Sequence, residues 1–138
     1  FIYINLAHNI MTTEVTEGIQ ITVKSFYRPE FSNPLKNHFL YTYKITIENN
    51  SNETVQLMSR HWFIFDSNAD RYEVEGEGVI GFQPILSPGD IHEYESSCEL
   101  TSEMGNMHGA YTMQRQIDDS LFDVKVPKFD MIAPMKLN

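Results

Sequence analysis

Strict alternation of apolar and polar residues between Phe39 and Glu48 constrains the fold of this chain most. Tyr41, Tyr43, Ile45 and Ile47 occupy every second position, and threonines or charged residues stand between them. Successive side chains of a β-strand point to opposite faces, so this pattern predicts a strand with one buried face. A helix would need a period near 3.6 residues, and no segment shows a convincing one.

Six further segments carry strand-like patterns separated by turn signals such as Pro88-Gly89. Seven short strands without helices predict an all-β fold, a fibronectin type III or immunoglobulin-like β-sandwich. We expect Trp62 to be buried in it and the tail after Pro127 to pack as an irregular arm. The predicted strands are Ile19–Phe26, Phe39–Glu48, Val55–Asp66, Arg71–Glu75, Ile91–Leu100, Gly109–Ile117 and Leu121–Val126.

The length of 138 residues suits one domain with a core of its own. Residues 1–10 are apolar, but they lack a basic start and are too short to span a bilayer. Because Met11 followed by two threonines resembles a natural start, we interpret residues 1–10 as an upstream extension and 11–138 as the single domain.

The net charge of -9 argues against nucleic acid and anionic membranes as partners, because both repel an acidic protein. Lys and Arg form no run that would override this balance. The single cysteine, Cys98, excludes an intrachain disulfide and suits a reducing compartment, so we expect a cytoplasmic protein without membrane insertion. Cys98 itself is expected to be a small buried residue on a strand.

The segment with Gly76, Gly78 and Gly81 matches the G-x-G-x-x-G pattern of dinucleotide-binding folds. That pattern binds pyrophosphate only when a helix follows and points its N-terminus at the ligand. Here Phe82 to Pro88 contains two prolines and then leads into a strand, so we reject a Rossmann site. The glycines are predicted to form a bulged loop and to be required by the backbone conformation of that loop.

A glycine loop can still bind an anion through backbone N–H groups if Arg60 or Arg71 lies close enough to offset Glu75 and Glu77. The sequence therefore leaves open a small anion or a divalent cation as ligand. The predicted ligand or partner surface consists of this loop and neighbouring strand residues: Arg60, Trp62, Gly76, Gly78, Gly81 and Gln83.

No pair of histidines has the spacing that strands or helices use to hold zinc, so we expect no preformed metal site, although a constellation from distant strands stays open. No nucleophile elbow or marked pair of carboxylates appears either. We predict no catalytic residues, no cofactor and no enzymatic activity.

Several motifs occur in an order that resembles the ApaG family across residues 14–138. They are Arg60-His61-Trp62, then Val74–Gly81 leading into Gln83-Pro84, then Leu86-Ser87-Pro88-Gly89, the spaced positions Tyr94, Ser96, Leu100, Thr101, Gly105, Met107, Gly109, Tyr111 and Met113, and a closing stretch from Val126-Pro127 to Pro134. The departures are Ile80 for a usual valine, Ser102 for a common proline, and His61 at an often aromatic position.

The resemblance implies a fibronectin type III-like domain that is found alone in bacteria and as a module in eukaryotic F-box proteins and a polymerase-delta-interacting protein. It also implies a link to diadenosine tetraphosphate hydrolysis and to cobalt and magnesium tolerance or efflux. Reuse as an appended module favours a non-enzymatic domain that binds a protein partner. The alternative is a binder of phosphate, pyrophosphate, nucleotide or a divalent cation at the glycine loop, and homo-oligomerisation stays open.

Overall fold

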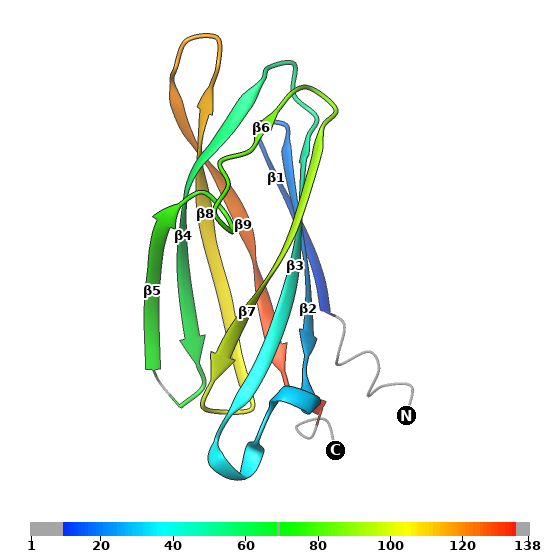
Figure 1. Cartoon of the computed structure of the whole chain (residues 1–138), viewed down its shortest axis with the longest axis vertical. Coiled ribbons are helices and arrows are strands. Elements are labelled where there is room, and N and C mark those ends of the chain that lie inside the picture. Colours follow the sequence, from blue (N-terminus) through cyan, green and yellow to red (C-terminus); the bar gives the residue numbers. More distant parts are fainter. Residues whose placement is uncertain (1–9, 69, 135–138) are drawn as a thin grey trace.

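The computed structural model describes residues 10–68 and 70–134, and these form two antiparallel sheets that pack face to face (Figure 1). One sheet has the order β1-β2-β3-β7, and the other has the order β5-β4-β8-β9 with β6 beside β4. The predicted all-β sandwich is confirmed. The strands are β1 (Ile10–Thr16), β2 (Ile19–Tyr27), β3 (Phe39–Asn49), β4 (Val55–Asp66), β5 (Asp70–Glu77), β6 (Ile85–Leu86), β7 (Ile91–Leu100), β8 (Met104–Arg115) and β9 (Leu121–Ile132).

The alternating sequence of β2 and β3 becomes the buried face of the first sheet. Every second residue of both strands is buried, and Ile45 is completely so. Trp62 of β4 is 3% exposed, as predicted, and its ring meets Tyr43, Tyr111 and Phe129 edge-on at centroid distances of 5.7, 6.2 and 6.3 Å. Edge-to-face packing adds specific attraction to the burial of these rings.

Two strands were missing from the sequence-based prediction. In β1 the exposed side chains include Met11 and Val15, so its apolar residues do not mark a buried face. A two-residue turn, Glu17-Gly18, joins β1 to β2 with φ of 49° and 81°, although Glu is not the usual first residue of such a turn. β6 has only two residues, too few for a periodic pattern. Residues 1–9 of the expected extension lie outside the described residues.

β8 begins at Met104, earlier than the predicted start at Gly109, because Gly105 belongs to the strand and not to the segment before it. A Cβ at Gly105 would lie 2.3 Å from the carbonyl oxygen of Phe65, and one at Gly109 would lie 2.1 Å from that of His61. Both glycines therefore let β8 approach β4 closely.

The prediction of an irregular arm after Pro127 was wrong, because β9 continues to Ile132. Pro127 and Lys128 together oppose the single residue His108 of β8, which makes a β-bulge. The bulge leaves the proline, which has no N–H to donate, without a ladder partner, so the strand can run through it.

Asp66 stabilises one end of the sandwich, where β4 ends. Its carboxylate is fully buried and accepts hydrogen bonds from the Thr101 N–H (2.6 Å), the Thr101 Oγ1 (2.8 Å) and the Ser102 hydroxyl. A buried carboxylate needs such donors to replace its water shell. Cys98, on β7 of the first sheet, is a buried free thiol, as expected.

Candidate functional site

The glycine loop, residues 78–84, connects β5 to β6 and contains a tight turn from Val79 to Phe82. The N–H of Val79 donates to the carbonyl of Phe82 (2.8 Å), and the N–H of Phe82 donates to the carbonyl of Val79 (3.0 Å). The two central residues, Ile80 and Gly81, have φ of 48° and 77°. Two successive positive φ values indicate a type I′ turn, so the last glycine of the pattern is needed by the turn itself.

A β-bulge in β4 anchors this loop. The register shifts between Leu57 and Ser59, so Met58 is left out of the pairing with β8. Its carbonyl oxygen accepts hydrogen bonds from the Gly78 N–H and from the Gln83 amide nitrogen, both at 2.9 Å. The two ends of the turn are therefore fixed to the same carbonyl group.

Arg60 secures the other side of the loop. Its Nη1 donates to the carbonyl oxygens of Glu77 and Gly78, each at 3.0 Å. The guanidinium lies against Gly76, where a Cβ would be 2.8 Å from Nη1. The loop thus turns two carbonyl groups toward a cation, whereas a phosphate-binding nest turns N–H groups toward an anion.

A cavity of about 220 Å³ separates the loop from β3, β4 and β7. It is lined by Tyr43, Arg60, Trp62, Glu77, Val79, Ile80, Gly81, Tyr94 and Ser96. The structure therefore brings all six predicted residues to the loop and its support, but Trp62 contributes from the core and not from the surface. Beside the cavity the hydroxyls of Tyr94 and Tyr111 share a hydrogen bond of 2.5 Å, and burial raises the pKa of both groups.

The loop displays apolar side chains to solvent, which sequence reasoning did not identify. Ile80 is 55% exposed and Phe82 is 66% exposed, and Ile85 of the adjoining β6 is 57% exposed. We call Ile80 and Phe82 the apolar tip. The available signal was an isoleucine beside a glycine where a type I′ turn would normally have Asn or Gly.

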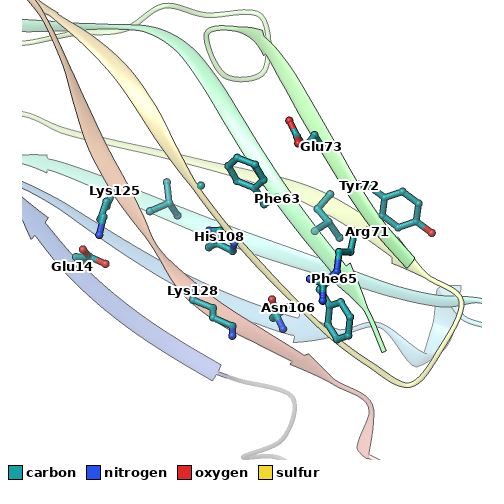
Figure 2. A pocket seen from close by; sticks show the side chains of 13 residues that line it. Glu14, Phe63, Phe65, Arg71, Tyr72, Glu73, Asn106, His108, Lys125 and Lys128 are labelled. Atoms are coloured by element: carbon teal, nitrogen blue, oxygen red, sulfur yellow. The ribbon is translucent and has the colours of Figure 1, made fainter. Parts of the chain in front are cut away.

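A larger concave site, the outer groove, lies on the outward face of the second sheet and has a volume of about 860 Å³ (Figure 2). Phe63 and His108 stack in its floor at a centroid distance of 5.1 Å, and the Arg71 guanidinium lies 4.7 Å from the centre of the Phe65 ring. Arg71 therefore belongs to this groove, whereas Arg60 alone reaches the glycine loop. Sequence reasoning missed the groove because its residues come from β1, β4, β5, β8 and β9.

One cross-strand constellation beside the groove contains potential metal ligands: His61 of β4 with Glu73 and Glu75 of β5. The His61 Nε2 lies 3.0 Å from a Glu73 oxygen and 3.4 Å from a Glu75 oxygen, and all three side chains are partly or largely exposed. Such exposed histidine–carboxylate contacts form on many protein surfaces without a metal. Among the described residues there is no helix long and apolar enough to cross a membrane.

Comparison with known proteins places this geometry in a family. An ApaG domain model matches residues 29–115. Protein ApaG from Brucella canis is 45% identical over 124 residues, which cover 90% of this chain and 95% of that protein. Protein ApaG from Anaeromyxobacter dehalogenans is 45% identical over 128 residues, which cover 93% and 100%. A crystal structure described as an ApaA protein from Bordetella pertussis has a TM-score of 0.81 and 32% identity, and covers 91% of this chain and 98% of that one.

Proposed function

The chain belongs to the ApaG family, and we propose that it is a non-enzymatic module that binds a protein partner through the apolar tip of the glycine loop. The observation that carries this proposal is the conformation of Ile80. A β-branched residue with positive φ costs about 1–2 kcal/mol relative to its normal conformation, and Asn or Gly would avoid most of that cost. Yet Ile80 is 55% exposed, so its own burial does not account for its presence.

The anchoring of the loop supports the same function. Arg60, Gly78 and Gln83 all make hydrogen bonds that hold the loop on β4, so the tip is presented on a fixed support. A rigid loop loses little conformational entropy when a partner binds. The exposed tip would then bury apolar surface against the partner.

The alternative, a small anion or a divalent cation at this loop, has less support from the geometry. The N–H of Gly78 and the Nη1 of Arg60 already donate to protein carbonyls, so an anion would have to compete with those bonds. A thermal-shift titration with pyrophosphate, nucleotides, magnesium and cobalt measures this alternative directly. A ligand present at 100 times its Kd should add about 2.7 kcal/mol of stability.

The protein-binding proposal is tested by an Ile80→Asn/Phe82→Ser variant. Asn is favoured in a type I′ turn, so the loop should keep its shape while the apolar tip is lost. The matched control, Leu35→Asn/Ile117→Ser, removes two apolar side chains that are 98% and 82% exposed elsewhere.

Proteins cross-linked to each version in cells are identified by mass spectrometry. We expect at least one protein to be captured by the wild type and the control but lost from the tip variant. Capture that is unchanged in the tip variant would exclude the tip as the binding surface, and equal loss in both variants would indicate unspecific hydrophobic adhesion. The link of the family to cobalt and magnesium tolerance would, on this proposal, act through the captured partner.

A further inference from the structure

The outer groove has a separate chemistry from the glycine loop, because it lies on the outward face of β5 and its neighbours. Cross-strand pairs join Glu73 of β5 to Phe63 of β4, and Phe63 to His108 of β8. Lys125 and Lys128 of β9 border the far side (Figure 2). The groove therefore crosses four strands, with aromatic rings in its floor and charged side chains along its walls.

The bulge in β9 turns one of these charged side chains, that of Lys128, outward to the groove. Strict alternation would turn Lys128 inward if Lys125 faces outward. Instead Val126 and Pro127 are both buried, Lys128 is exposed and Phe129 returns to the core. β-bulges often redirect a side chain in this way beside functional sites.

The basic residues of the groove form no direct ion pairs within the part of the chain that the structure describes, and they outnumber its acidic residues. Among the ion pairs of the described residues, none involves Arg71, Lys125 or Lys128. The acidic residues that line the groove are Glu14 and Glu73, and the Glu73 carboxylate lies 3.0 Å from the His61 ring nitrogen. Three cations against two carboxylates leave the lining of the groove with one excess positive charge in a chain with a net charge of -9, and this excess complements a negatively charged ligand.

The floor of the groove accepts an apolar group. Phe63 is 37% exposed, and its ring stacks with His61 at a centroid distance of 4.4 Å and with His108 at 5.1 Å, so the edges of three aromatic rings form the centre of the surface. Arg71 lies over Phe65 on one side of this surface, and Lys128 lies on the other side. The arrangement suits a ligand with an apolar centre and a negative group at each end.

The spacing of the cations indicates what kind of ligand this is. Arg71 on β5 and Lys128 on β9 are three inter-strand steps apart, about 14 Å at about 4.8 Å per step. The strand pairing also offsets them by two residues, about 7 Å, along the strands, so they lie about 16 Å apart. An extended peptide advances about 3.3 Å per residue, so the Cα atoms of residues four apart are about 13 Å from each other, and the long glutamate, lysine and arginine side chains cover the remaining distance. We propose that the outer groove binds an extended acidic segment of a partner protein, with two carboxylates at i and i+4 and an apolar residue between them.

The test uses a fluorescein-labelled peptide with the pattern Glu-Ser-Phe-Ser-Glu and its isomer in which the two glutamates are adjacent. Fluorescence anisotropy should show tighter binding of the spaced peptide. Lys125→Glu/Lys128→Glu should weaken that binding by about 10-fold or more, because two attractive pairs become repulsive. The control Lys24→Glu/Lys36→Glu makes the same change in net charge outside the groove and should stay within about two-fold of the wild type.

Three results would overturn the proposal: no binding of the spaced peptide, equal binding of both peptides, or equal weakening by the groove and control variants. Inorganic phosphate is titrated in parallel. If phosphate binds with the same dependence on Lys125 and Lys128 while the spaced peptide does not, the groove is a small-anion site and not a peptide site. The Ile80→Asn/Phe82→Ser variant should keep full peptide affinity, so the groove and the apolar tip are tested independently.

Discussion

Alanine in place of Gly78 should destabilise the protein far more than alanine in place of Gly81, although both glycines belong to the same G-x-G-x-x-G pattern. Both have positive φ, 59° and 77°. They differ in their surroundings. A Cβ on Gly78 would lie 2.0 Å from the carbonyl oxygen of Phe82, whereas a Cβ on Gly81 would have no heavy atom within 4 Å.

The expected magnitudes follow from these contacts. Gly81→Ala has to hold alanine in the left-handed conformation, which costs about 1 kcal/mol. Gly78→Ala carries the same cost and must also separate the backbone at Phe82, which disrupts the two hydrogen bonds of the Val79–Phe82 turn. At about 1 kcal/mol for each hydrogen bond, the total reaches about 3 kcal/mol. Gly76→Ala should fall between the two, because the Arg60 guanidinium that it displaces ends a flexible side chain.

Urea unfolding at constant pH measures all three variants. With an m-value of about 2 kcal/mol/M, the midpoint should fall by about 0.5 M for Gly81→Ala and by about 1.5 M for Gly78→Ala. An unchanged m-value is the control that the unfolded states are comparable. If Gly78→Ala lowered the midpoint no more than Gly81→Ala, the close approach of the loop backbone would not be what requires the glycine.

Three further predictions concern buried titratable groups. Burial raises the pKa of Asp66, but hydrogen bonds from Ser102 and Thr101 lower it by more, so the pKa lies below its ordinary value. The ionised carboxylate should therefore stabilise the folded protein above about pH 4, and this stabilisation should be lost as the pH falls below that value. Urea unfolding at pH 3 and pH 7 measures the difference, which should be smaller in Ser102→Ala. Burial raises the pKa of Tyr94 and Tyr111, so the free energy of unfolding should decrease as the pH rises beyond about 10. At neutral pH Tyr111→Phe should lower the free energy of unfolding by about 1–2 kcal/mol, because the Tyr94 hydroxyl loses its hydrogen-bond partner. Burial raises the pKa of Cys98 to about 12, so iodoacetamide at pH 8 should modify the folded protein on the order of 10³-fold more slowly than the urea-unfolded chain.

The strands that the sequence predicted are those with a buried face and side chains of alternating polarity. β4 has the predicted bounds, Val55–Asp66, and the predicted Phe39–Glu48 strand differs from β3 by one residue. Besides the missed strands β1 and β6, the errors fall where a contact from another strand decides the conformation. Gly105 was left outside the predicted strand, but it belongs to β8, where the carbonyl of Phe65 lies close beside it. Pro127 resembles the end of a strand, but β9 continues through it because of the bulge opposite His108.

The two candidate surfaces also differ in how far the sequence could predict them. Sequence reasoning named Arg60 and Arg71 as the arginines that could lie close to the glycine loop, and the structure places Arg60 there. Sequence reasoning could not predict which backbone groups the loop turns toward Arg60, because the glycine pattern does not distinguish carbonyl groups from N–H groups. The outer groove gave no local signal, because Lys128 faces it only after the bulge has changed the alternation of β9.

Both surfaces depend on the register of β5, which lies at the edge of its sheet. Arg71 and Glu73 point to the groove, whereas Gly76 faces Arg60 on the opposite side of the strand. A shift of one residue would exchange the two faces. The hydrogen bond from Gly78 to Met58 follows directly after the last β5 pair, so it can fix this register. Gly78→Ala should therefore also weaken binding of the acidic peptide, whereas the turn-compatible Ile80→Asn should leave it unchanged, and this contrast separates loss of register from loss of the tip.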